Sequence, residues 1–355
     1  MTSVGEPVGA VQAGRAAVLD ELRAVHKAVV VTHEHPDGDA LGSLIAMQQV
    51  LTALGRDSWM FIAESDLPLP YEYRFLPLDS VISKAPEDLD ERTVIFLDCG
   101  NIERNPAAER LRPDGGWGHI LNIDHHHDNT RFGGVNYVDP QASCTAELVW
   151  DLAHALDVEL TPAIASALYV GLITDTGCFM YENTSPRAHM MAAELIAAGV
   201  DVHAIYQQVY EGVPFGKLAL LARGLLNAER YDDGRLTASQ LSAEDFAAAD
   251  AEESYSEGVI DHLRAVRGTA MAALARDRLG APGEPADSQD GSARLRKVSL
   301  RASDMRIDVS AIARAQGGGG HRAAAGFSTS LPWEELVAFL REQLAEQLEN
   351  LPASE

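Results

Sequence analysis

The sequence predicts an α/β protein with two domains, a first domain built on a parallel sheet and a smaller mixed α/β domain after it. Short β-branched runs alternate with segments of helical periodicity through the N-terminal half. Several of these runs end in aspartate or histidine. At 355 residues the chain is also long enough to bury two hydrophobic cores.

The first domain is expected to cover residues 1–200. Because its strands alternate with helices, they should pair in parallel. A long connecting helix over 201–230 should then carry the chain into the second domain. The predicted strands of the first domain are 27–33, 58–64, 93–100 and 119–126, and its helices are 11–25, 38–54, 143–156, 161–173 and 186–199.

The second domain is expected to cover residues 231–355 and to mix strands with helices. A segment rich in Gly, Pro, Asp and Ser, 281–292, separates two of its strands and is typical of a mobile hairpin loop. The predicted strands are 235–241, 269–278 and 296–303, and the predicted helices are 259–266 and 332–349.

Composition excludes several classes of protein. With 53 acidic and 28 basic residues, the net charge of -25 should repel long nucleic acids, whose affinity depends on neutralising phosphates. No apolar run is long enough to span a membrane and no signal peptide is recognisable, so a cytoplasmic location is expected. Cys99, Cys144 and Cys178 are isolated and lack CxxC spacing, which excludes a disulfide framework and a structural zinc finger.

Candidate metal ligands follow three of the predicted strands. The stretch VTHEHPDGDALGS contains His33, His35, Asp37 and Asp39, and two other strands lead into Asp98 and His125. In open α/β sheets, ligands bind outside the carboxyl ends of the strands, so these side chains should converge. Asp37 and Asp39 are separated only by Gly38, so these two carboxylates could serve two neighbouring ions. Asp98 could then bridge the two ions. Asp175, in ITDTG, would complete the set.

The ligand types restrict the metal. Imidazole and carboxylate without thiolate favour Mn2+, with Mg2+, Co2+ or Fe2+ as alternatives. A second feature, the run GGGGH at 317–321, is either a flexible linker or a rigid loop whose backbone N–H groups bind an anion. Arg301 and His321 would add positive or hydrogen-bonding groups, which favours the anion site.

These motifs carry a family resemblance. HEHPDGDALGS, the DCG that begins at Asp98, DHHHDNTRFG from Asp124 to Gly133, and ITDTG around Asp175 resemble the four motifs of the DHH phosphoesterase superfamily. GGGGH, with VSLRAS upstream, resembles its DHH-associated C-terminal domain. The short, two-domain oligoribonuclease and pAp-phosphatase group (nanoRNase type) is the most similar form, and the resemblance covers nearly the whole chain.

The resemblance implies a site with two metal ions in the cleft between the domains. One ion would be held by His33, Asp37 and Asp98, and the other by Asp39, Asp98, His125 and Asp175. Together the ions would activate a water that attacks phosphorus in line. His126 would contact the scissile phosphate and assist the leaving oxygen. Substrate contacts are implied for Arg131, Arg301, Gly318, Gly319, Gly320 and His321, whereas His35 and His127 are not ligands.

The implied substrates are short: pApA, RNA of two to five nucleotides, pAp and, as in some bacterial members, cyclic di-AMP. Homodimers occur in this family. Two alternatives stay open. One is a family II inorganic pyrophosphatase, disfavoured because the second domain contains GGGGH in place of a lysine- and arginine-rich phosphate motif. The other is a non-catalytic nucleotide-binding module, disfavoured because pure binding does not need six acid and imidazole groups.

Overall fold

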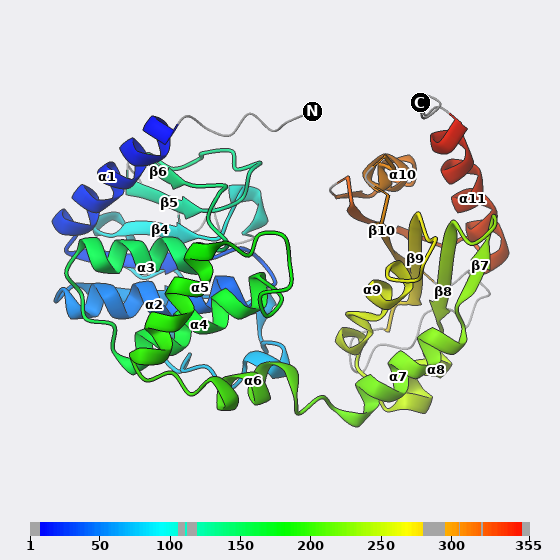
Figure 1. Cartoon of the computed structure of the whole chain (residues 1–355), viewed down its shortest axis with the longest axis horizontal. Helices are drawn as coiled ribbons and strands as arrows, with labels where there is room; N and C mark the ends of the chain where they lie inside the picture. The colour runs from blue at the N-terminus through cyan, green and yellow to red at the C-terminus, as the bar shows by residue number, and fades with distance from the viewer. Residues whose placement is uncertain are drawn as a thin grey trace. The chain divides into compact units, whose positions relative to one another are not determined.

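The computed structural model describes residues 8–105, 111, 119–279, 295–304, 306–320 and 322–349. The chain forms two compact units, Met1–Gly212 and Val213–Glu355, called here the first and the second unit (Figure 1). Each has its own sheet and its own core. The parallel sheet of the first unit and the mixed sheet of the second confirm the predicted fold class.

The first unit is built on a six-stranded parallel sheet with the order β3-β2-β1-β4-β5-β6. The chain adds strands on one side of β1 and then returns to add β4, β5 and β6 on the other. The sheet therefore has a topological switch point between β1 and β4, where open α/β sheets bind ligands. Its strands are β1 (Lys27–Val31), β2 (Asp57–Phe61), β3 (Val81–Ile82), β4 (Thr93–Leu97), β5 (Ile120–Asp124) and β6 (Val135–Val138).

Helices pack on one face of this sheet, where alternate strand residues such as Val30, Ile95 and Ile123 join apolar side chains of the helices in one core. On the opposite face, Val29, Val94 and their neighbours are covered by loops and short 3-10 turns. The helices are α1 (Val8–Ala24), α2 (Gly38–Ala53), α3 (Thr145–Ala155), α4 (Pro162–Asp175), α5 (Pro186–Ala197) and α6 (Val202–Tyr210).

The predicted single helix over 201–230 is wrong. The structure has two helices there, α6 and α7 (Phe215–Leu226), separated by four residues. Gly212 adopts a left-handed conformation, with φ of +76°, and Pro214 is the N-cap residue immediately before α7. A residue in the left-handed conformation interrupts a helix, and proline lacks the N–H group that a continuing helix needs. One continuous helix therefore cannot form, although the sequence has helical periodicity on both sides.

The second unit contains a six-stranded mixed sheet in the order β11-β12-β10-β9-β8-β7. β8 and β9 are parallel, and the other pairs are antiparallel. The predicted loop at 281–292, between β9 and β10, lies outside the described residues. The elements after α7 are β7 (Glu229–Tyr231), β8 (Leu236–Leu241), α8 (Ala243–Ala249), α9 (Val259–Arg264), β9 (Met271–Asp277), β10 (Arg296–Ala302), α10 (Val309–Ala315), β11 (Gly319–Gly320), β12 (Ala324–Thr329) and α11 (Trp333–Glu349).

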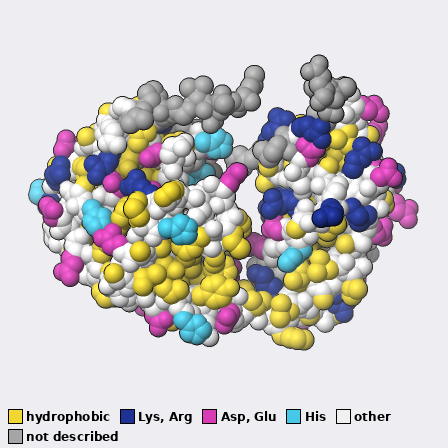
Figure 2. All heavy atoms as spheres, viewed as in Figure 1, with side chains coloured by type: hydrophobic (Ala, Val, Ile, Leu, Met, Phe, Trp, Pro, Cys, Tyr) yellow, Lys and Arg dark blue, Asp and Glu magenta, His cyan; other side chains and the backbone are white. Residues whose placement is uncertain are grey.

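The two units differ in surface chemistry. Figure 2 shows Lys and Arg side chains over the visible face of the second unit, which contains more than half of the 28 basic residues. On the first unit, α5 and α6 expose large apolar side chains such as Met190 and Tyr206. Figure 2 shows a broad hydrophobic area on the visible face of this unit. Within the described ranges no single helix is long and apolar enough to cross a bilayer; α5 and α6, bent by 115°, pass that test only as a pair.

Candidate metal centre

The loop after β1 places three of the predicted ligands. His33 is buried two residues beyond the strand, and Asp37 caps the amino end of α2, where its carboxylate accepts hydrogen bonds from the N–H groups of Asp39 and Ala40 at 3.1 and 3.0 Å. Aspartate is a preferred helix cap because it satisfies N–H groups that have no partner within the helix. Asp39, in the first turn of α2, is buried.

Close packing of α2 on α4 brings Asp39 toward Asp175. A Cβ atom at Gly38 would lie 2.4 Å from the hydroxyl of Thr174, and one at Gly171 would lie 2.8 Å from Oδ1 of Asp39. Glycine is needed where atoms of a neighbouring element approach the backbone this closely. Gly38 therefore does more than separate two aspartates, because it allows α2 to lie against the residue that precedes Asp175.

Asp98 occupies a strained position directly after β4. Its φ of +55° lies in the left-handed region, which residues other than glycine rarely adopt. Its two carboxylate oxygens face different partners. Oδ2 lies 3.5 Å from Nε2 of His33, whereas Oδ1 lies 3.6 Å from Nε2 of His125 and 3.6 Å from Nδ1 of His126. Strain of this kind is common at functional sites, where the surrounding structure holds the residue in place.

The last residue of β5, Asp124, is fully buried and positions the two histidines that follow it. Its Oδ1 atom accepts hydrogen bonds from the backbone N–H of His125 at 2.9 Å and from Nδ1 of His126 at 2.7 Å. Its Oδ2 atom accepts one from the side-chain amide of Asn129 at 2.6 Å. Because Asp124 engages Nδ1 of His126, the ring orientation of His126 is set by a buried carboxylate.

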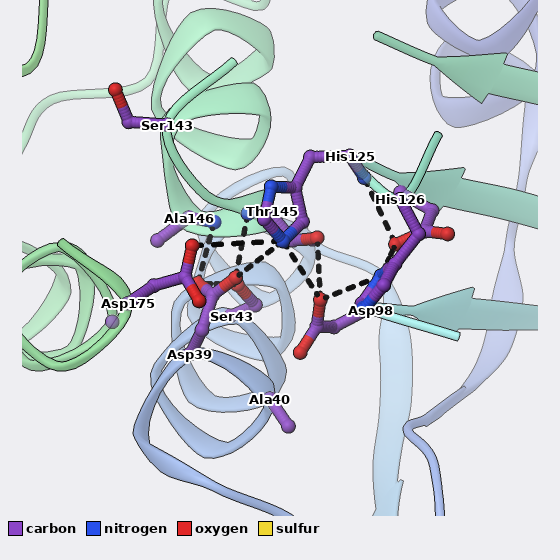
Figure 3. Close-up of polar contacts among 12 residues, drawn as sticks. Asp39, Ala40, Ser43, Asp98, His125, His126, Ser143, Thr145, Ala146 and Asp175 are labelled. Carbon is purple, nitrogen blue, oxygen red and sulfur yellow. Dashed lines mark hydrogen bonds and ion pairs between the residues drawn. The ribbon is translucent and has the colours of Figure 1, made fainter. Parts of the chain in front are cut away.

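These groups form overlapping clusters in which one ligand atom from each residue lies within 4.8 Å of the others. The first cluster is His33, Asp37 and Asp98. The second is Asp39, His125 and Asp175, and a third combines Asp98 with His125 and His126. Figure 3 shows Asp39, Asp175 and Asp98 pointing toward His125 from three elements of the fold. The structure thus brings all six predicted ligands together.

The amino end of α3 is a part of the site that the sequence did not reveal. The backbone N–H groups of Thr145 and Ala146 donate to Asp39 at 2.6 and 2.9 Å, and the Thr145 hydroxyl donates to Oδ1 of Asp98 at 3.0 Å (Figure 3). Asn183, also missed, donates to Oδ2 of Asp175 at 3.1 Å. The signal that the sequence offered was the predicted helix over 143–156, which begins close to Thr145.

Electrostatics in this site favour a cation. Burial raises the pKa of Asp39 well above its usual range, and the neighbouring carboxylates of Asp98 and Asp175 add to the rise. Burial likewise raises the pKa of Asp175 to about 6. Burial would also raise the pKa of Asp98, but a hydrogen bond from His33 and the nearby imidazoles outweigh it and hold that pKa well below the usual value. Crowded, buried carboxylates of this kind are costly unless positive charge compensates them.

The donor set fits a divalent metal. Carboxylate oxygens and imidazole nitrogens suit Mn2+ and similar ions, and the hydrogen bonds from Asn183 and the α3 backbone orient the carboxylates as a metal site requires. Within the part of the chain that the structure describes, the ion-pair partners of Asp39, Asp98 and Asp175 are histidines, not lysine or arginine. The residues present could therefore hold metal ions.

Other predicted residues lie apart from these clusters. His35 and His127 are exposed, and His35 pairs with Asp66 across 3.5 Å. Arg131 is exposed on the loop that follows His126, with φ of +52°. None of the three belongs to the clusters that the described residues form.

The predicted anion site belongs to the second unit. Gly319 and Gly320 form β11 and pair with Gly326 and Ala325 of β12, so this part of the glycine run is not a free linker. Arg301, half-buried on β10, pairs with the start of β12. Arg301 and the glycine strand therefore lie on the two sides of β12. His321 lies outside the described residues.

Family models match both units: the DHH family N-terminal domain over residues 27–172 and the DHHA1 domain over residues 235–350. The bifunctional oligoribonuclease and PAP phosphatase NrnA of Thermus thermophilus is 33% identical over 336 residues, which cover 92% of this chain and 93% of the relative. The chain belongs to the DHH family of phosphoesterases. Within that family it is of the two-domain oligoribonuclease and PAP phosphatase type, and the predicted family and hydrolase class are confirmed.

Solved structures support the same DHH fold. An exopolyphosphatase-related protein from Bacteroides fragilis superposes with a TM-score of 0.80 at 23% identity, and the match covers 98% of each chain. RecJ from Thermus thermophilus, crystallised with Mn2+, matches with a TM-score of 0.54 at 17% identity, over 98% of this chain and 55% of RecJ. At these identities the likeness is one of fold.

Proposed function

We propose that this DHH protein is a metal-dependent phosphodiesterase and phosphatase that hydrolyses short nucleotides to mononucleotides. The substrates would be pApA, RNA of two to five nucleotides, pAp and cyclic di-AMP. The observation that carries the proposal is the convergence of six imidazole and carboxylate groups in two clusters, which a third cluster links through Asp98 and His125. The names of the relatives, oligoribonuclease and PAP phosphatase, support short RNA and pAp among these substrates.

Two divalent ions, with Mn2+ as the first choice, would occupy the two main clusters. His33, Asp37 and Asp98 would hold one ion, and Asp39, Asp98, His125 and Asp175 the other. When bound, such ions supply an activated water and compensate the negative charge of the phosphoryl group. The overlap at Asp98, whose two oxygens face His33 and His125, supports a pair of ions over a single one.

His126 would act on the leaving group. Asp124 accepts the hydrogen bond from Nδ1, so Nε2, on the opposite side of the ring, is the atom that we assign to the substrate. As the oxygen of a water that has lost a proton to solvent bonds to phosphorus and the ester P–O bond breaks, a protonated His126 would donate its Nε2 proton to the departing oxygen and regain one from solvent. The hydrogen bond from Nδ1 to the buried Asp124 carboxylate holds the ring in the orientation that this transfer needs.

The second unit would bind the rest of the nucleotide. Arg301, His321 and the glycine segment of Gly318, Gly319 and Gly320 are proposed to hold a second phosphate or the sugar. The N–H of Gly318 donates to the backbone oxygen of Ala313 at 2.9 Å, so it is not among the proposed donors. Arg131 of the first unit is proposed as a further substrate contact. The second unit has 16 basic and 22 acidic residues against 12 and 31 in the first unit, and its lower acidity supports an anion-binding role despite the net charge of -25. Short substrates suit a chain whose overall charge repels long polyanions.

One hydrolysis panel tests the proposal. Purified chain with Mn2+ would be assayed for AMP release from pApA, for cleavage of pGpG, of cyclic di-AMP and of RNA of two to five nucleotides, and for phosphate release from pAp and from pyrophosphate. We expect turnover of pApA and pAp. Turnover of pyrophosphate alone would favour the pyrophosphatase alternative, and binding without turnover of any substrate would favour a nucleotide-binding module.

A further inference from the structure

Thr145 contacts two of the proposed ligand carboxylates through different groups. Its backbone N–H donates to Oδ2 of Asp39 at 2.6 Å, and its hydroxyl donates to Oδ1 of Asp98 at 3.0 Å. These two aspartates lie on different elements, the first turn of α2 and the end of β4. Thr145 is therefore hydrogen-bonded to both carboxylates and links the position of Asp39 to that of Asp98 (Figure 3).

The local structure makes Thr145 a rigid donor. It is the first residue of α3, so its N–H has no partner within the helix and is available to Asp39. Its side chain is fully buried, and a β-branched side chain has few alternative rotamers. A buried hydroxyl held in one rotamer presents its hydrogen bond to Asp98 from a fixed direction.

The segment before Thr145 extends this support to a third carboxylate. The side-chain amide of Asn183 donates to the backbone oxygen of Ser143 at 2.9 Å and to Oδ2 of Asp175 at 3.1 Å. In return, the hydroxyl of Ser143 donates to the backbone oxygen of Asn183 at 2.7 Å. The residues at the amino end of α3 are thus hydrogen-bonded to Asp39 and Asp98 directly and to Asp175 through Asn183.

We propose that Thr145 is a positioning residue of the metal centre, whose hydroxyl sets the orientation of Asp98 and thereby the affinity for the pair of cations. The inference rests on the proposed function. A carboxylate shared by two cations would contribute to both sites, so a change in its orientation would affect both. Hydrogen bonds to ligating carboxylates commonly change metal affinity by about 10–100-fold when they are removed.

The test compares Thr145→Val, which keeps the shape and the backbone N–H but removes the hydroxyl, with Thr145→Ser, which keeps the hydroxyl. Isothermal titration calorimetry with Mn2+ should show binding weakened about 10–100-fold in Thr145→Val and nearly restored in Thr145→Ser. Thr237→Val is the matched control, because it removes a buried hydroxyl hydrogen bond from the second unit. It should bind Mn2+ as the wild-type chain does. If the valine variant does not fold, Thr145→Ala replaces it.

The outcomes separate this inference from the function on which it rests. Wild-type chain that binds Mn2+ and hydrolyses pApA, together with a folded Thr145→Val variant of unchanged Mn2+ affinity, would overturn the role of Thr145 alone. Equal weakening in Thr145→Val and Thr145→Ser would also overturn it, since the hydroxyl would then not be the cause. Wild-type chain that neither binds Mn2+ nor hydrolyses pApA would overturn the proposed function and this inference with it.

Discussion

The carboxylate of Asp98 lies between two histidines of the first unit, with Oδ2 3.5 Å from Nε2 of His33 and Oδ1 3.6 Å from Nε2 of His125. The two histidines follow different strands, β1 and β5, and Asp98 follows β4, which lies between them in the sheet. The order of strands therefore determines which ligand is central. The left-handed backbone of Asp98 holds its side chain between these neighbours.

Replacing Asp98 should affect both proposed ions at once. We expect Asp98→Asn, which keeps the shape of the side chain but removes its charge, to lower kcat/KM for pApA by about 10³-fold and to lower the Mn2+ content of the chain. Asp79→Asn, at an exposed position, is the control and should match the wild type. Metal content would be measured by mass spectrometry after gel filtration. Unchanged turnover by Asp98→Asn would contradict the assignment.

His126 should matter for the rate more than for metal binding. We expect His126→Ala to lower kcat for pApA by about 10²–10⁴-fold, the usual range for loss of a general acid, while Mn2+ binding measured by calorimetry stays close to wild type. Asp124→Asn should lower kcat in the same direction, because Asp124 orients the His126 ring. Loss of bound Mn2+ from His126→Ala would instead identify His126 as a ligand, in the alternative cluster with Asp98 and His125.

Removal of metal should destabilise the protein in a pH-dependent manner. Without cations, the folded-state pKa values of Asp39 and Asp175 lie above those of an unfolded chain, with that of Asp175 near 6. The folded state then binds more protons, so stability falls as pH rises through that window and recovers as pH falls. Bound Mn2+ compensates the same carboxylates. The Tm difference between Mn2+-loaded and chelated protein should therefore be larger at pH 8 than at pH 5.5; a difference that grows on acidification would contradict this.

Two neighbouring glycines of the second unit offer a matched pair of variants. A Cβ atom at Gly318 would lie 2.2 Å from the backbone oxygen of Gly326, whereas one at Gly319 would have no neighbour within 4 Å. We expect Gly318→Ala to lower Tm, because the hairpin must open. Gly319→Ala should keep the wild-type Tm but raise KM for pApA if the backbone there approaches a phosphate. Wild-type KM in Gly319→Ala would place the anion elsewhere.

The ligands of the candidate centre were predictable because each depends on a local pattern. His33, Asp98 and His125 directly follow apolar β-branched runs, and a parallel sheet brings such strand ends to one edge. The family resemblance then related them to a known set of motifs. The boundaries of most helices and strands were also close to those predicted, since periodicity determines them.

What could not be predicted depends on contacts between distant residues or on backbone geometry. Thr145 and Asp39 are 106 positions apart, so nothing near either residue indicates their hydrogen bond. The same holds for Asn183, because only the folded structure brings its side-chain amide to Ser143 and Asp175. The break between α6 and α7 was missed because apolar periodicity continues on both sides, although Gly212 and Pro214 could have signalled it.

All six proposed metal ligands belong to the first unit, between His33 and Asp175, and the second unit has a separate core. The parts of the chain that would break a phosphoester bond and those that would recognise a particular nucleotide can therefore diverge independently. Members of one family could keep the same hydrolytic groups while substitutions on β10 and β11 select substrates of different size. Such modularity would let a single ancestral hydrolase give rise to enzymes for several small nucleotides.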